Sequence, residues 1–296
     1  MAVEHQYQEI LEFAYGLAEK ATDLILKGSA ARWNKTDEIE EKKNSVDLVT
    51  ETDQAVEDMI KAAVAEKYPS HQLYSYAAGD RPPLTDEFTW IVDPIDGLTN
   101  DSFSVVGVIA LPFLHQIFSA RLGGGAFMNR TTPLPLTGGI PQPLTDLSKC
   151  MIGAEWGSDR TEQTFAKKTA SFARLAGDPT KGVKGGIMAH ALRTTGSTCC
   201  NVAAIAAGQL DVYWDAGCFP WDVCAGAIIV SETGGFFSGG KDAEAQNTTD
   251  ADVLMGRRYI FVRALPPSKT ESAEEIQRRL AKELYEVVDE WTNEDM

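Results

Sequence analysis

Residues 90–100 read WIVDPIDGLTN, an apolar run that ends in two aspartates three positions apart. Asp93 and Asp96 follow residues that should be buried, so a solvated acidic surface does not explain why they cluster. Pro94 and Gly97 predict a tight turn around them. Carboxylates gathered in such a turn need a cation or a proton between them, and hard oxygen ligands favour Mg²⁺ or Ca²⁺ over zinc. The alternative is that both aspartates cap the turn and the element after it.

Three further aspartates lie where a strand is expected to give way to a helix. Asp47 and Asp53 bracket the segment LVTET, and Asp222 follows Trp221 at the start of a predicted helix. Taken singly, each of the three is as well explained by helix capping as by metal binding. Taken together, they favour a cation held by carboxylates.

A hydroxyl-rich segment, TTGST at residues 194–198, opens a predicted apolar helix. The backbone N–H groups and the dipole of such a helix start can receive a phosphate. A Thr/Ser cap on a core helix is the more common use of this pattern, so both interpretations stay open. A bound metal beside an anion-receiving helix start would allow an acidic protein to bind phosphate.

Alternating helices and strands must bring these segments together. Apolar spacing and capping residues predict helices over residues 7–26, 52–66, 160–177, 194–208, 221–235 and 272–291. Short β-branched and apolar runs predict strands over residues 46–50, 71–76, 89–95, 105–112, 151–157, 211–217, 234–240 and 257–265, with a strand pair over 115–129. This order predicts a layered α/β architecture.

The charge of the chain limits its partners. Its 296 residues include 43 acidic and 27 basic side chains, which give a net charge of −16. Such a charge repels nucleic acid and anionic membranes, and an anionic substrate would need cations concentrated at its site.

Cysteine spacing and the N-terminal sequence indicate the compartment. The five cysteines form no CxxC pair, so we expect free thiols and no zinc site. Neither an export signal nor a run of roughly 18 apolar residues is present, so we expect a cytoplasmic protein that does not enter a membrane.

Three segments in order, DLVTETD (47–53), WIVDPIDGLTN (90–100) and WDVCAGAIIVSETGG (221–235), resemble the signatures of the inositol monophosphatases. These enzymes belong to a wider superfamily of Mg²⁺-dependent, lithium-sensitive sugar phosphatases. The resemblance implies a five-layer αβαβα sandwich of the sugar-phosphatase type, usually a homodimer. It also implies two halves, 1–145 with most metal ligands and 146–296 with Asp222 and the substrate-facing helix.

The same resemblance implies a reaction and a set of site residues. Inositol monophosphate, a small phosphorylated polyol, would be hydrolysed by a metal-activated water without a covalent intermediate. The implied Mg²⁺ ligands are Asp93, the carbonyl of Ile95, Asp96 and Asp222. Asp53, Asp47 and Thr99 would serve the catalytic water, and the substrate would face Gly97, Leu98, Ser158, Gly196, Ser197, Thr198 and Asp215.

The chain departs from the family pattern at three places. A GEE element is absent between Tyr74 and Ser75, Leu98 replaces a threonine, and the segment after Asn100 is short enough to allow for the loss of one strand. These departures predict weak or absent catalysis. Two alternatives therefore stay open: an impaired member that acts as a binding or regulatory protein, and a phosphatase for another sugar phosphate or a nucleotide bisphosphate.

Overall fold

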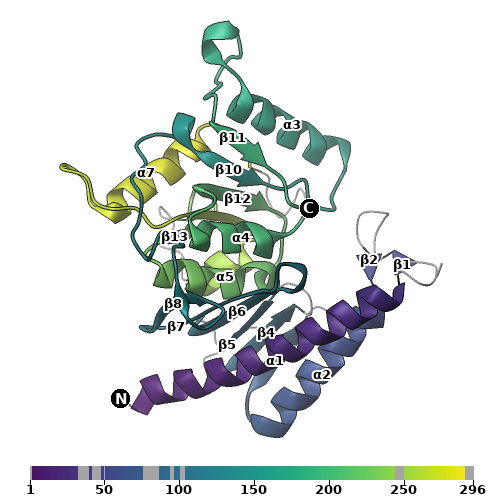
Figure 1. Cartoon of the computed structure of the whole chain (residues 1–296). Coiled ribbons are helices and arrows are strands. Elements are labelled where there is room, and N and C mark those ends of the chain that lie inside the picture. Colours follow the sequence, from purple (N-terminus) through teal and green to yellow (C-terminus); the bar gives the residue numbers. More distant parts are fainter. Residues whose placement is uncertain are drawn as a thin grey trace.

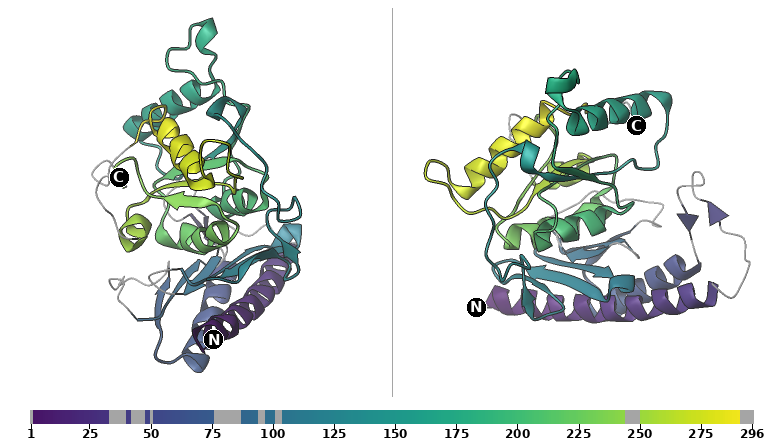
Figure 2. Two further views of the ribbon diagram at one scale, coloured as in Figure 1. Left: turned by 90° about the vertical axis from the view of Figure 1, so that its left-hand side faces the viewer. Right: turned by 45° about the horizontal axis from the view of Figure 1, so that its top comes forward.

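Five layers of secondary structure stack on one another in the computed structural model (Figure 1). The structure describes residues 2–32, 40–41, 48–49, 51–75, 87–93, 97–100, 104–243 and 250–290. A helix pair covers a seven-stranded sheet, a second helix pair lies between this sheet and a five-stranded sheet, and two helices cover the outer face of the latter (Figure 2). The predicted αβαβα sandwich is confirmed.

The first sheet is continuous at the position where a strand could have been lost. β5 is hydrogen bonded to both neighbours, with Leu98 opposite Val92 on β4 and Val108 on β6. The sequence allows for the loss of a strand after Asn100, and this expectation is wrong, because residues 97–100 themselves form a strand between β4 and β6. The strands in spatial order are β3 (Gln72–Ser75), β4 (Thr89–Asp93), β5 (Gly97–Asn100), β6 (Val106–Leu111), β7 (Gln116–Arg121), β8 (Gly125–Met128) and β9 (Thr132–Pro133).

The outer helix pair packs on this sheet through an apolar stripe. α1 (Ala2–Arg32) is longer than the predicted 7–26, and it buries Ile10 and Leu17 at helical spacing. α2 (Glu51–Lys67) buries Val56 and Ile60 in the same cluster. Next to these helices, β1 (Glu40–Glu41) and β2 (Leu48–Val49) form a separate antiparallel pair.

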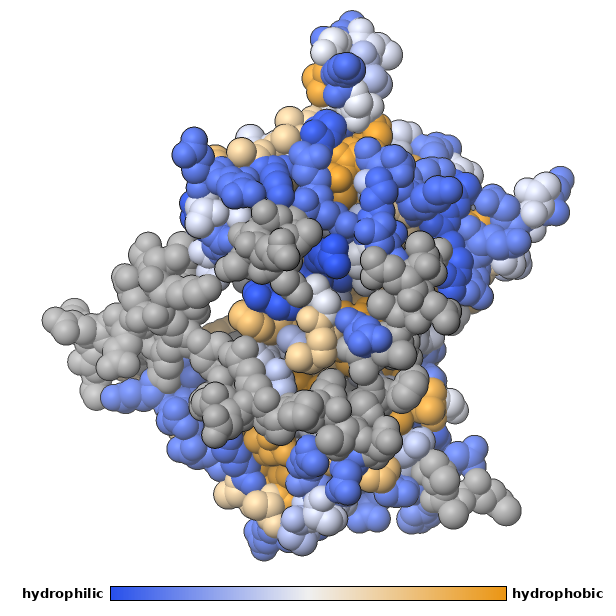
Figure 3. Space-filling view, turned by 180° about the vertical axis from the view of Figure 1, so that it is seen from behind, coloured by the Kyte–Doolittle hydropathy of each residue, from blue (hydrophilic) through white to orange (hydrophobic). Residues whose placement is uncertain are grey.

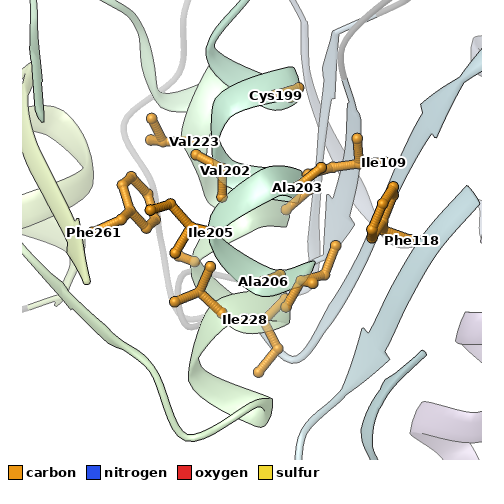
Figure 4. Close-up of a cluster of buried hydrophobic side chains, with 14 of the residues drawn as sticks. Ile109, Phe118, Cys199, Val202, Ala203, Ile205, Ala206, Val223, Ile228 and Phe261 are labelled. Atoms are coloured by element: carbon orange, nitrogen blue, oxygen red, sulfur yellow. The ribbon is translucent and has the colours of Figure 1, made fainter. Parts of the chain in front are cut away.

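The middle helix layer is apolar on all sides because a sheet covers each face. α4 (Thr198–Ala207) and α5 (Pro220–Glu232) lie between the two sheets. In the close-up, Ile109 and Phe118 of the first sheet lie on one side of α4, and Phe261 of the second lies on the other (Figure 4). Residues of both halves of the chain therefore share one core.

The second sheet combines parallel and antiparallel pairs. β10 is parallel to β11 and β12, whereas β14 is antiparallel to β12 and β13. In spatial order the strands are β11 (Ala191–Arg193), β10 (Met151–Ala154), β12 (Val212–Ala216), β14 (Arg258–Val262) and β13 (Phe236–Ser238).

Two amphipathic helices cover this sheet. α3 (Glu162–Ala176) begins after the cap Thr161, and α7 (Ala273–Tyr285) begins after Ser272, whose reciprocal hydrogen bonds with Glu275 form a capping box. α7 ends before the predicted position 291. A short α6 (Asp250–Met255) precedes β14.

The exterior of the upper layers is largely hydrophilic. Hydrophilic side chains predominate over the upper layers of the face seen from behind (Figure 3). Within the described residues, no helix has both the length and the apolar character needed to cross a membrane. The five cysteines carry free thiols, as predicted.

Candidate functional site

Asp93 is carried to the end of a fully buried strand. The three residues before it in β4, Trp90, Ile91 and Val92, are each 0 % exposed, whereas Asp93 is half-buried. The register then pairs Asp93 with Gly97 on the next strand. The prediction that an apolar strand ends in this carboxylate is confirmed. The turn residues outside the described part of the chain are Pro94, Ile95 and Asp96.

Asp222 lies in the first turn of α5, where it caps the helix. Its Oδ2 accepts a hydrogen bond from the Phe219 backbone N–H at 2.6 Å. The neighbouring Trp221 is buried, and its ring lies 4.6 Å from that of Phe219 and 5.9 Å from that of Tyr74 on β3, measured between centroids. The capping interpretation of Asp222 is therefore correct. A carboxylate has two oxygens, however, so capping and metal binding are compatible roles.

Asp93 and Asp222 both lie near one buried thiol. Burial is the main cause of the raised pKa of Cys224, and the negative charges of Asp222 and Asp93 raise it further. The elements that carry the two aspartates, β4 and α5, pack on each other. The fold thus places two carboxylates that are far apart in the sequence on elements that pack on each other.

The remaining predicted ligands are not assembled in the described part of the structure. Its residues form no group of three His, Cys, Asp or Glu side chains that could hold a metal ion. Asp53 is half-buried in the first turn of α2. Asp47, like Ile95 and Asp96, lies outside the described residues. For Gly97, Leu98 and Thr99 the structure describes only the backbone, which forms a strand. The complete ligand set therefore stays a prediction.

The TTGST segment receives an anion from within the protein. The Glu155 carboxylate accepts hydrogen bonds from the Thr195 and Gly196 N–H groups at 2.7 and 3.0 Å and from Asn201 Nδ2 at 2.7 Å. Ser197 caps α4 by accepting from the Cys200 N–H at 3.2 Å. The interpretation as a capped core helix is therefore the correct one for this segment. The N–H groups of Thr195 and Gly196 donate to Glu155, so the prediction that they receive a phosphate is wrong for these two residues.

Asp215 is held in a buried polar cluster on β12. It is 4 % exposed, and its Oδ2 lies 2.5 Å from the Tyr213 hydroxyl and 3.3 Å from the Thr198 hydroxyl. Burial is the largest influence on its pKa and raises it, while the Tyr213 hydrogen bond and the charge of Lys168 lower it. The cluster joins two predicted substrate residues, Thr198 and Asp215.

Lys168 belongs to this region and is absent from the sequence prediction. It is 2 % exposed on the inner side of α3, and its ammonium donates to the Trp156 carbonyl, two residues before the half-buried Ser158. The sequence does contain a signal, because the buried residues of α3 follow helical spacing and this stripe includes a lysine. They are Thr164, Lys168, Ser171 and Leu175.

Glu232 gives the ETGG part of the third signature a structural role. Its two carboxylate oxygens accept from the backbone N–H groups of Gly123 and Gly125 at 2.8 and 2.7 Å. These glycines form the turn between β7 and β8, and both have positive φ, which favours glycine. The end of α5 is thereby tied to the first sheet.

Comparisons with known proteins agree with this arrangement. The model of the inositol monophosphatase family matches residues 6–288. The protein qutG of Emericella nidulans is 38 % identical over 309 residues, which cover 95 % of this chain and 93 % of the relative. Human inositol monophosphatase 1 is 33 % identical over 248 residues, which cover 77 % of this chain and 83 % of the relative.

A solved structure supports the fold. The inositol monophosphatase of Anabaena (Nostoc) sp. superposes with a TM-score of 0.70 at 22 % identity. The match covers 95 % of this chain and 96 % of that protein. The two chains therefore share one architecture.

Proposed function

Because this chain belongs to the inositol monophosphatase family, we propose that it is a Mg²⁺-dependent phosphatase that hydrolyses inositol monophosphate to inositol and phosphate. The observation that carries this proposal is the packing of β4, which ends in Asp93, on α5, which holds Asp222 in its first turn. Family membership supports phosphate hydrolysis as the class of reaction. The identity of the substrate as a phosphorylated polyol is our proposal.

The described donors fit a magnesium ion. Asp93 and Asp222 supply carboxylate oxygens, which are the hard ligands that Mg²⁺ prefers. Asp96 and the Ile95 carbonyl would complete the set from the intervening turn. When bound, Mg²⁺ would polarise the phosphate and lower the pKa of a coordinated water.

The protein residues would orient the reactants. Asp53, supported by Asp47, would accept a hydrogen bond from the attacking water, and Thr99, the residue after Leu98 in the sequence, would supply a hydroxyl. Asp215 would accept a hydrogen bond from a hydroxyl of the polyol. Further contacts to the substrate would come from Gly97, Leu98, Ser158, Ser197 and Thr198.

A second substrate class is favoured by the relatives. A protein of Neurospora crassa named quinic acid degradation cluster protein x is 35 % identical over 320 residues. Quinic acid is a ring bearing several hydroxyl groups, like inositol, with a carboxylate in addition. A phosphate ester of such a ring acid is therefore the alternative substrate.

A phosphate-release assay tests the proposal. The purified chain is incubated with inositol monophosphate, with or without Mg²⁺, and compared with Leu98→Thr and with a variant that also carries a restored GEE element. We expect Mg²⁺-dependent release that rises in both variants, since each restores a group that the family uses at the site. A phosphorylated quinate and a nucleotide bisphosphate serve as competing substrates.

Two results would contradict it. Release of phosphate independent of Mg²⁺ would exclude the metal-assisted reaction. No turnover in any of the three proteins, together with no tight uptake of Mg²⁺ in calorimetry, would instead indicate a binding or regulatory protein. Light scattering of the same samples checks the proposed homodimer.

A further inference from the structure

An arginine with a strained backbone lies just before β14, beside the turn that leads to Asp222. Arg257 has a φ of +55°, in the left-handed region that residues other than glycine seldom adopt. Glycine takes this conformation without the steric cost of a Cβ. Strain of this kind persists where the surrounding structure holds the residue firmly. The side chain of Arg257 is therefore expected to have a role that glycine could not fill.

The guanidinium of Arg257 is held against the turn at residues 217–219. Nη2 donates to the Gly217 carbonyl at 2.5 Å, and Nε donates to the Cys218 carbonyl at 3.5 Å. The central carbon of the guanidinium lies 4.1 Å from the centroid of the Phe219 ring, which makes a cation–π contact. The backbone carbonyl of Arg257 also accepts from the Gly217 N–H at 2.8 Å. Arg257 thus contacts each of the three residues of the turn.

The turn connects Arg257 with Asp222. The Phe219 N–H donates to Asp222 Oδ2 at 2.6 Å, and the Phe219 ring is stacked on that of Trp221 at an angle of 13° between their planes. A shift of Phe219 would therefore move the donor that orients the carboxylate. A planar guanidinium can donate to two carbonyls while it stacks on a ring, whereas a lysine ammonium has the charge without this shape. The contacts of Arg257 depend on the shape of its side chain.

We propose that Arg257 is a positioning residue that holds the carboxylate of Asp222 in one orientation, ready for Mg²⁺, by fixing the turn at residues 217–219. That Asp222 binds Mg²⁺ rests on the proposed function. Arg257 is not a metal ligand itself, because a guanidinium stays protonated and only donates hydrogen bonds. Its positive charge repels a nearby cation, so a favourable effect of Arg257 on Mg²⁺ binding must come from geometry.

Hydrogen exchange in the metal-free protein tests the hold on the turn. Arg257→Lys keeps the charge without the planar group, and Arg257→Gly removes the side chain at a position whose φ suits glycine. In both variants we expect the Phe219 amide to exchange at least about tenfold faster in NMR, because local opening of the turn becomes easier. The matched control is Arg258→Lys, since Nη1 of Arg258 lies 3.9 Å from Glu290. This control should leave the exchange unchanged.

Calorimetry tests the consequence for the metal. We expect the affinity for Mg²⁺ to fall about tenfold in Arg257→Lys and Arg257→Gly, as is typical when a partner that orients a metal-binding residue is lost. Arg258→Lys should bind Mg²⁺ as the wild type does. If the charge alone mattered, Arg257→Gly would bind Mg²⁺ more tightly and Arg257→Lys would bind it equally well. If the role were only structural, the melting temperature would fall and the affinity would not change.

Phe219→Leu tests the same connection from the other side. It removes the ring under the guanidinium and keeps the N–H that donates to Asp222. If Arg257 acts through this ring, adding Arg257→Lys to Phe219→Leu should lower the affinity for Mg²⁺ less than Arg257→Lys does alone. Should Arg257→Lys fail to fold, Arg257→Gly and Phe219→Leu still decide the proposal.

Three results would overturn the proposal, and one would separate it from the proposed function. It is wrong if exchange of the Phe219 amide is unchanged in the Arg257 variants, if their affinity for Mg²⁺ is unchanged, or if that affinity rises. If the wild type takes up no Mg²⁺, the proposed function fails. Faster exchange of the Phe219 amide in the variants would still show that Arg257 holds the turn before Asp222.

Discussion

The Glu155 carboxylate lies 3.0 Å from the backbone nitrogen of Gly196, so an internal anion occupies the loop that the sequence marks as an anion receiver. Glu155 is 7 % exposed, and Thr195 and Asn201 donate to the same oxygen. A buried carboxylate with several donors is a strong fixing point for a loop. The start of α4 is therefore preorganised in the absence of ligand.

Replacing Glu155 by alanine should destabilise the protein strongly. The change removes this acceptor from the buried amide of Asn201 and from the N–H groups of Thr195 and Gly196, at a cost of about 1–3 kcal/mol for the loss at a buried group. Glu155→Gln keeps an acceptor oxygen and should cost less. Urea unfolding monitored by tryptophan fluorescence measures both. Equal stability of Glu155→Ala and the wild type would show that the loop is held by other contacts.

The close approach of α4 and α5 predicts a second effect. A Cβ on Gly226 would lie 2.3 Å from Val202 Cγ1, so Gly226→Ala forces the helices or the valine to shift. We expect a loss of roughly 1–3 kcal/mol from overpacking. In the matched control, Gly16→Ala in α1, the new Cβ meets no atom within 4 Å, and stability should rise by about 0.5–1 kcal/mol. Thermal unfolding of both variants compares them directly, and a stabilised Gly226→Ala would contradict the packing argument.

Apolar spacing and capping residues in the sequence predicted the layered α/β fold and the position of Asp93 at the end of a strand. The capping residues of α7 and the apolar run of β4 act over a few neighbours, so Ser272 and Asp93 could be placed correctly. The role of Glu155 could not be read in this way, because its partners lie 40 residues or more away in the sequence. β5 was missed because its pairing on both sides, not its own composition, makes GLTN a strand.

Acid should remove the contribution of Asp146 to stability. Hydrogen bonds from Ser148 and Thr145, together with Lys149, lower the pKa of Asp146 from 3.8 to about 2. A lowered pKa stabilises the fold above pH 3.8, and this contribution is lost as the pH falls toward 2. Since the side chain is 44 % exposed, Asp146→Ala should cost only about 0.5 kcal/mol at pH 7.

Urea unfolding at pH 7 and pH 3 tests this dependence. The difference between Asp146→Ala and the wild type should shrink at the lower pH. Lys149→Ala, which removes a 65 % exposed ammonium, should cost less at either pH. A difference that grows on acidification would show that Asp146 stabilises the fold in its protonated form.

Metal binding provides the most direct test of the site, through Asp222→Asn. The asparagine oxygen can still accept from the Phe219 N–H, so the helix cap should survive, whereas the charge that attracts Mg²⁺ is lost. We expect Mg²⁺ affinity in calorimetry to fall at least about tenfold, or roughly 1.4 kcal/mol. Wild-type protein with Mg²⁺ at about 100 times its Kd should gain about 2.7 kcal/mol of stability, which EDTA removes.

The matched control for this prediction is Asp178→Asn, because Asp178 also caps a turn, by accepting from the Thr180 N–H at 2.8 Å. It lies away from β4 and α5, so its Mg²⁺ affinity should equal that of the wild type. If Asp222→Asn takes up Mg²⁺ as the wild type does, the carboxylate of Asp222 serves the helix cap alone, and the packing of β4 on α5 no longer supports a shared cation.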